Sequence, residues 1–136
     1  MRRYQALVIA PLLSLTSCFG LFDNGTDSIV DKYEVTWIDV HAQRALYCDG
    51  SEVVPAYIAA VGYNSKYLFV KQHPLAGEHD EKVLESITNY YLIERTQNES
   101  QDRPIYGPLS EEKFNVLCNE LGIEEVTFST HYPENI

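Results

Sequence analysis

Cys18 has the clearest chemical role in this sequence, because of the residues that precede it. The tripeptide Leu15-Thr16-Ser17 stands directly before it, after two arginines near the start and an apolar stretch from Ala6 to Leu15. A basic start, a short apolar run and small residues before a cleavage point are the features of a secretory signal peptide. A thiol at the first position after such a cut is available for alkylation by a lipid.

The order of an aliphatic residue, two small residues and Cys18 resembles the lipobox of bacterial lipoproteins, where diacylglycerol is attached to the thiol before cleavage. We therefore predict a signal peptide over residues 1–17 and a mature chain that begins at a lipidated and N-acylated Cys18. Each buried methylene adds about 0.8 kcal/mol of membrane affinity, so several acyl chains would anchor the chain firmly. The alternative is a secretory signal followed by an incidental cysteine.

The type of anchor and its membrane can also be predicted from these residues. The apolar stretch contains Pro11 and is shorter than the roughly 20 residues that a spanning helix needs. We therefore expect no spanning anchor in this segment. Phe19 follows the cysteine where an Asp can signal inner-membrane retention in some bacteria, which favours the outer membrane if the host has one.

Two further cysteines, Cys48 and Cys118, remain once Cys18 is lipidated. In an oxidising compartment an even pair favours a disulfide. Closing a loop of about 70 residues would stabilise the fold by roughly 4 kcal/mol in the chain-entropy model. The alternative is that both thiols are small buried apolar groups.

The histidines could bind a metal or a small ligand, above all His73 and His79, which share one polar segment with Asp80 and Glu81. A metal site needs three or four ligands in fixed geometry, and the short spacings that pre-organise such sites are missing. We predict no metal site and no cofactor, and keep the segment from His73 to Glu81 as an alternative ligand site.

Catalysis has little support. Asp39 and His41 could form a general-base pair at a strand end, and a hydrolase would need His41 buried beside a nucleophile in a cleft. No serine has the context of a nucleophile elbow. We therefore expect a protein that is not an enzyme and has no catalytic residues.

Tyrosine is abundant: of the ten tyrosines only Tyr4 lies in the predicted signal peptide. Tyrosine is enriched at protein interfaces, although on strands it also packs for structural reasons. The neighbours Tyr90 and Tyr91 must point to opposite faces of a regular strand. We expect one of them to be an exposed anchor for a partner.

The charge excludes one class of partner. The whole chain has a formal net charge of −10, and loss of Arg2 and Arg3 with the signal peptide lowers it to −12. Nucleic-acid binding needs clustered Lys and Arg, whereas the cations of the mature chain are scattered. We predict an acidic domain without nucleic-acid partners.

The elements that must position these residues follow from hydrophobic periodicity and turn residues. Removing 17 residues from 136 leaves 119, enough for one domain. We predict a membrane-proximal tether over residues 18–30 and one domain over residues 31–133. Strands are predicted at residues 33–40, 44–48, 57–63, 66–72 and 88–95, a tight Asp49-Gly50 turn after the second, and a further strand at 126–129.

A helix is predicted from the Ser110 cap to about Leu121. Its apolar residues Phe114, Leu117, Cys118 and Leu121 share one face. The expected fold is α+β, a single antiparallel sheet of about five strands with one C-terminal helix packed on it.

Two segments carry a family resemblance: residues 61–74, which read VGYNSKYLFVKQHP, and residues 106–114, which read YGPLSEEKF. They resemble a family of small uncharacterised bacterial lipoproteins. The shared motifs are a hairpin and a helix entry, so the resemblance implies a lipid-anchored envelope protein and no catalytic residues. We therefore expect a non-enzymatic, membrane-anchored module that binds an envelope protein or polymer; the alternative is a lipoprotein that binds a small ligand or a metal.

Replacing Cys18 by Ala tests the anchor. Because lipid attachment needs the thiol, we expect Cys18→Ala to lose palmitate incorporation and to move from the membrane fraction to the soluble fraction. Metabolic labelling and fractionation measure both effects. Equal membrane retention of Cys18→Ala and the wild type would contradict the predicted lipidation.

Overall fold

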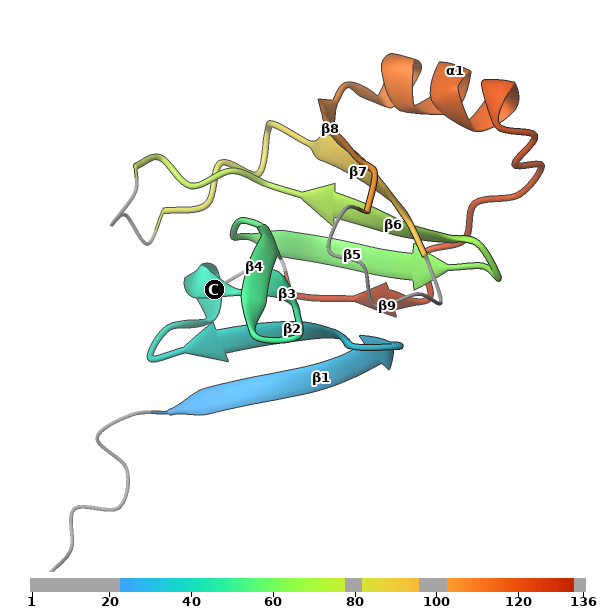
Figure 1. Cartoon of the computed structure of the whole chain (residues 1–136). Coiled ribbons are helices and arrows are strands. Elements are labelled where there is room, and N and C mark those ends of the chain that lie inside the picture. The colour runs from blue at the N-terminus through green and yellow to red at the C-terminus, as the bar shows by residue number, and fades with distance from the viewer. Residues whose placement is uncertain (1–22, 78–81, 96–102, 134–136) are drawn as a thin grey trace, which may run out of the picture.

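The computed structural model describes residues 23–77, 82–95 and 103–133. These residues form two antiparallel sheets and one α-helix (Figure 1). The four-stranded sheet has the order β1-β2-β3-β4 and contains β1 (Asn24–Val30), β2 (Tyr33–Ile38), β3 (Ala45–Cys48) and β4 (Ser51–Val54). The five-stranded sheet has the order β8-β7-β6-β5-β9 and contains β5 (Ile58–Tyr63), β6 (Tyr67–Gln72), β7 (Asn89–Glu94), β8 (Ile105–Leu109) and β9 (Thr130–His131). Helix α1 (Glu111–Glu120) follows β8, and a 3₁₀ turn, η1 (His41–Gln43), follows β2.

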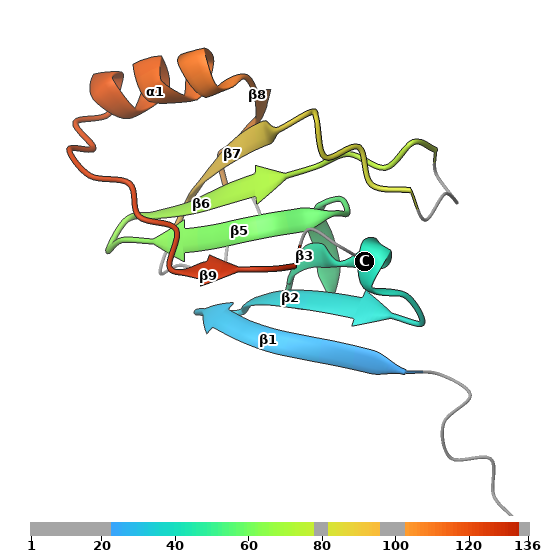
Figure 2. The same ribbon diagram turned by 180° about the vertical axis from the view of Figure 1, so that it is seen from behind.

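The α+β class is confirmed in outline, but the prediction of a single sheet is wrong. The four-stranded sheet packs on one face of the five-stranded sheet, and α1 covers the other face (Figures 1 and 2). The molecule is therefore built in three layers. Alternation along a strand shows which side chains share a face, but it does not show which strands share a sheet.

The two hairpins predicted from turn residues are present. Asp49 and Gly50 have φ angles of 52° and 81°, as a two-residue turn between β3 and β4 requires. Asn64 Oδ1 accepts hydrogen bonds from the backbone N–H groups of Lys66 and Tyr67 at 2.8 and 2.7 Å. This side chain therefore holds the turn between β5 and β6.

The layers are held by two apolar clusters on opposite faces of the five-stranded sheet. Val70 and Tyr91 point toward the four-stranded sheet, where they meet Tyr33, Val35 and Leu46. Their neighbours point the other way, and the cluster on that side contains Phe69, Tyr90, Leu92, Phe114, Cys118 and Ile123. Strands β6 and β7 are consequently apolar on both faces.

Helix α1 begins and ends where the sequence predicts. The side chain of Ser110 accepts a hydrogen bond from the N–H of Lys113 at 3.2 Å, which satisfies one of the free donors of the first turn. Phe114 and Cys118 are buried against the sheet. Gly122, with φ of 72°, follows the last turn and provides the left-handed stop.

Three segments differ from their predictions. Residues 24–30, predicted as part of a tether, form β1, because every backbone partner is supplied by β2 despite the polar sequence. Residues 107–109, predicted as a helix entry, belong to β8. The last strand is Thr130–His131 instead of residues 126–129.

Gly62 explains the displaced last strand. A Cβ atom at this position would lie 1.8 Å from the carbonyl oxygen of Thr127, so only glycine lets the chain cross β5 there. Val126 and Phe128 then pack on the helix-side cluster. These apolar residues cover a face of the sheet and do not extend its edge.

A buried guanidinium packs against Tyr132, which follows the edge strand β9 and lies in the cluster between the two sheets. Arg44 is 6% exposed, and its Cζ lies 4.4 Å from the ring centroid of Tyr132 and 5.8 Å from that of Tyr57. Cation–π attraction is strongest where water is excluded. The hydroxyl of Tyr57 donates to the carbonyl oxygen of Pro133, so the same cluster holds the end of the described chain.

A second arginine joins the two sheets at their edge. Arg95, after β7, binds Asp31 in the β1–β2 turn through Nε at 2.9 Å and Nη2 at 3.1 Å. Its Nη1 also donates to the carbonyl oxygen of Asn64. The hydrogen bond from Arg95 is the main cause that lowers the pKa of Asp31.

Asp31→Asn tests the ion pair between Asp31 and Arg95, because it removes the negative charge. Asn also tolerates the φ of 53° at this position, so the turn should be kept. A lowered carboxyl pKa adds stability that is complete above about pH 4 and disappears as the pH falls through the pKa of the folded state. We expect the free energy of unfolding of the wild type to exceed that of Asp31→Asn by about 0.2–1 kcal/mol at pH 7, since the pair is partly exposed. In strong acid we expect the two free energies to be equal. Urea unfolding at several pH values measures the difference.

Asp49→Asn is the matched control, because Asp49 also has a positive φ and its carboxylate lies 3.9 Å from Nζ of Lys32, with both side chains exposed. An equal effect of both substitutions at pH 7 would contradict the role given to Arg95.

Candidate functional site

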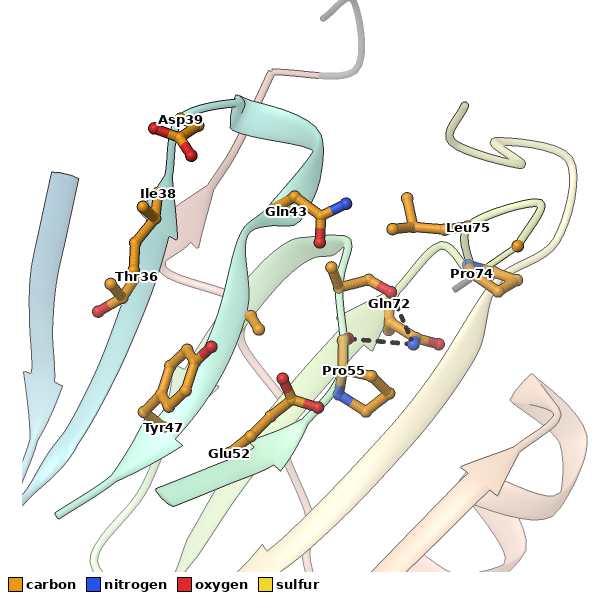
Figure 3. Close-up of a pocket in the computed structure, with 13 residues that line it drawn as sticks. Thr36, Ile38, Asp39, Gln43, Tyr47, Glu52, Pro55, Gln72, Pro74 and Leu75 are labelled. Carbon is orange, nitrogen blue, oxygen red and sulfur yellow. Dashed lines mark hydrogen bonds between the residues drawn. The ribbon is translucent and has the colours of Figure 1, made fainter. Parts of the chain in front are cut away.

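The main candidate site is a cleft of about 710 Å³ on the face of the four-stranded sheet that points away from the core (Figure 3). The sheet forms one side, and the chain that follows β6 forms the other. Ligand sites commonly occupy about 300–1,000 Å³. The lining residues are Thr36, Ile38, Asp39, Gln43, Ala45, Tyr47, Glu52, Pro55, Ala56, Gln72, Pro74, Leu75 and Gly77.

Strand register places the polar residues of the cleft. Glu34 pairs with Tyr47, and Tyr47 pairs with Glu52, so the three side chains form one row across β2, β3 and β4. In the neighbouring row Thr36 pairs with Ala45. Directly paired residues project from the same face of a sheet. The small side chain of Ala45 therefore leaves a hollow beside the larger Tyr47.

Gln72 fixes the part of the cleft where the two sheets meet. Its side chain is 3% exposed, and its Nε2 donates to the carbonyl oxygens of Pro55 and Ala56, both at 3.1 Å (Figure 3). Its Oε1 accepts a hydrogen bond from Asn89 Nδ2 at 2.9 Å. A buried amide with these partners holds the connection between β4 and β5 against β6 and β7.

The cleft is acidic. Among the described residues, its lining contains the carboxylates of Asp39 and Glu52 and neither lysine, arginine nor histidine. Burial, and then the charge of Glu52, raises the pKa of Tyr47. The phenol therefore stays protonated at neutral pH and can donate a hydrogen bond. These groups suit a ligand that carries positive charge or hydrogen-bond donors.

Asp39 marks one end of the cleft. It adopts a left-handed φ of 67°, and its N–H donates to the carbonyl oxygen of Asp23 at 2.7 Å. The predicted partner His41 is exposed, and its ring stacks on Trp37 with 4.0 Å between centroids. The buried His41 that a hydrolase would need is therefore not found.

Tyr90 and Tyr91 point to opposite faces of β7, as predicted, but neither is an exposed anchor. They are 8% and 7% exposed, because α1 covers one face of the strand and the four-stranded sheet covers the other. Burial is the main cause that raises the pKa of both phenols. The prediction of an interaction surface at these residues is wrong.

Cys48 and Cys118 are free thiols, so of the two alternatives for this pair, a disulfide or two small apolar groups, the structure shows no disulfide. Cys48 packs against the cluster between the sheets, and its Sγ lies 3.3 Å from Nη1 of Arg103. Cys118 lies in the cluster under α1, where burial raises its pKa. A disulfide needs Cα atoms within about 7 Å, whereas the five-stranded sheet stands between these two clusters.

His73 is a structural residue. It is buried, and its Nδ1 lies 2.8 Å from the carbonyl oxygen of Ile87. The other residues of the predicted ligand segment, His79, Asp80 and Glu81, lie outside the described residues, as does Cys18. Across residues 23–77, 82–95 and 103–133, no group of three or more His, Cys, Asp or Glu side chains could hold a metal ion. Within the same ranges no helix has the length and apolar character needed to cross a membrane.

Sequence reasoning missed Tyr47 and Glu52, although a signal was present. Both flank the Asp49-Gly50 turn, and pairing across that hairpin brings them face to face. The contribution of residues 72–77 could not be found, because it depends on how the second sheet packs beside the first.

The fold and the cleft together define a small two-sheet α+β domain with a polar recess. Residues 28–132 match the family described as "Protein of unknown function (DUF3997)". The match covers more than half of the chain, so the protein belongs to this family. Comparison with curated proteins gives no match, and comparison with solved structures gives none. The expectation that the family consists of bacterial lipoproteins stays a prediction.

Gln72→Leu tests the construction of the cleft. It removes both hydrogen bonds from the buried Gln72 amide to the β4–β5 connection and the one that Asn89 donates to it, so we expect a loss of about 1–3 kcal/mol in the free energy of unfolding. Chemical denaturation measures this loss. Asn119→Leu, at an exposed amide on α1, is the control and should cost less. Equal stability of Gln72→Leu and the wild type would contradict the role of Gln72.

Proposed function

We propose that this protein is a lipid-anchored binding protein of the bacterial cell envelope and that the acidic cleft is its ligand site. The observation that carries the proposal is the cleft itself, a recess of about 710 Å³ in which side chains from β2, β3, β4, β6 and the β6–β7 connection converge. The sequence before Cys18 supports the envelope location, because its pattern is that of a lipoprotein signal. An outer-membrane anchor is the form we favour where the host has that membrane.

Binding is favoured over catalysis by the arrangement of the polar groups. Asp39 lies at one end of the cleft and Glu52 at the other (Figure 3). General acid–base chemistry needs such groups within hydrogen-bond reach of the same reacting atoms. Within residues 23–77, 82–95 and 103–133, the lining hydroxyls are those of Thr36 and Tyr47, and the lining holds no histidine that could activate either of them.

The cleft replaces the tyrosine surface as the proposed contact with a partner. Tyr90 and Tyr91 are buried in the two apolar clusters, and the ring of His73 is hydrogen-bonded to a backbone carbonyl oxygen. The acidic lining and the negative net charge oppose nucleic acid and favour a partner with positive charge. An envelope molecule of this kind is the ligand that we propose.

Thr36→Trp tests the cleft as the binding site. The indole would project over Ala45 into the hollow, and both Thr and Trp are favourable in strands, so the fold should persist. We expect in-cell crosslinking of the full-length protein to capture a partner with the wild type and at least tenfold less of it with Thr36→Trp. Mass spectrometry of the crosslinked material gives the yield.

Thr26→Trp is the matched control, because Thr26 pairs with Thr36 in register but lies outside the cleft lining. We expect it to retain capture. Undiminished capture by Thr36→Trp, with thermal unfolding like that of the wild type, would show that the cleft is not the binding site.

A further inference from the structure

The acidic groups of the cleft are spread along it. Tyr47 and Glu52 lie at one end, where Glu34, just outside the lining, continues their row onto β2, and Asp39 lies at the other end. Ile38, the last residue of β2, follows Glu34 by four residues, which is about 13 Å at about 3.3 Å per residue, and Asp39 comes next. Glu52 lies two strands further across the sheet, at about 4.8 Å per strand. A single metal ion cannot bridge carboxylates at this separation. An elongated ligand with separate positive groups can.

The row at the Glu52 end has the chemistry of an ammonium site. Tyr47 is half-buried and has a carboxylate on each side, and its hydroxyl points toward the hollow in Figure 3. An ammonium group is attracted to the face of a phenol ring by cation–π interaction and to carboxylates by charge. The combination selects an organic cation over a neutral ligand.

The lining between the two ends suits a methylene chain. Ile38, Ala45, Pro55, Pro74 and Leu75 are apolar, and Ile38 is 57% exposed. A strongly hydrated inorganic cation gains nothing from such a surface, whereas aliphatic segments between ammonium groups do. The amide of Gln43 also stands along this stretch (Figure 3).

We propose that the cleft binds a linear aliphatic polyamine, with one terminal ammonium group beside Tyr47 and Glu52 and the other beside Asp39. This proposal rests on the proposed function and names the class of ligand for the same site. It accounts for the acidic character of the described lining, for the separation of the two carboxylates and for the apolar surface between them.

Isothermal titration of the full-length protein in a nonionic detergent tests the proposal with spermine, spermidine, putrescine and butylamine. We expect affinity to fall in that order, with spermine at least tenfold tighter than putrescine and no measurable binding of butylamine. Spermine has the largest separation between terminal ammonium groups in this series, so it can best reach both ends. Equal affinity for spermine and putrescine would overturn the proposed two-ended contact.

Substitutions that remove a negative charge and keep the shape of the side chain show which carboxylates contact spermine. Glu52→Gln and Asp39→Asn should each weaken spermine binding about two- to fivefold, in the range of partly exposed ion pairs, and the double variant by about the product. Asn is compatible with the φ of 67° at residue 39. Glu124→Gln makes the same change in net charge at an exposed position after α1, outside the cleft lining, and should leave affinity within twofold.

The outcomes separate the two proposals. If Glu124→Gln weakens binding as much as Glu52→Gln, the polyamine is held by diffuse charge and the inference is overturned. If spermine does not bind, or binds Thr36→Trp as well as the wild type, the inference also fails. The proposed function is still supported in those cases when Thr36→Trp loses its crosslinked partner, and it fails when that capture is unchanged.

Discussion

The structure depends on the burial of both faces of one sheet. In β6 and β7 consecutive residues are apolar, so Phe69 and Tyr90 require a cover on one side while Val70 and Tyr91 require a cover on the other. A sheet with two apolar faces is stable in water only as a central layer. The chain supplies α1 for one face and a second sheet for the other. The remaining elements are arranged around this requirement.

Local features of this fold could be predicted from the sequence, and the layering could not. Asp49-Gly50, Asn64 and Ser110 act on their nearest neighbours, so the turns and the helix start were predicted correctly. The consecutive apolar residues of β7 already indicated a strand buried on both sides, yet one of its tyrosines was expected at the surface. The polar residues of β1 have no periodicity, and only pairing with β2 makes them a strand.

The candidate site was still harder to predict. Its floor is the uncovered face of the four-stranded sheet, and its opposite side comes from residues 72–77, which belong to the other sheet and the chain beyond it. Nothing in the spacing of Tyr47, Glu52 and Gln72 shows that they share a recess. The sequence pairs Asp39 only with its neighbour His41, whereas the position of Asp39 in the cleft depends on the turn that ends β2. Such a site arises from long-range packing, which sequence periodicity does not encode.

The hydrogen bond between Asp39 and Asp23 also limits how far the cleft can stand from a membrane. The N–H of Asp39 is 2.7 Å from the carbonyl oxygen of Asp23, and five peptide units separate Asp23 from Cys18. A fully extended chain spans at most about 3.6 Å per residue, so with Cys18 lipidated as proposed the Asp39 end lies within roughly 20 Å of the anchor point. The opening would then lie in the solvent layer next to the lipid headgroups, because the short connection from Cys18 to Asp23 would prevent it from moving further away.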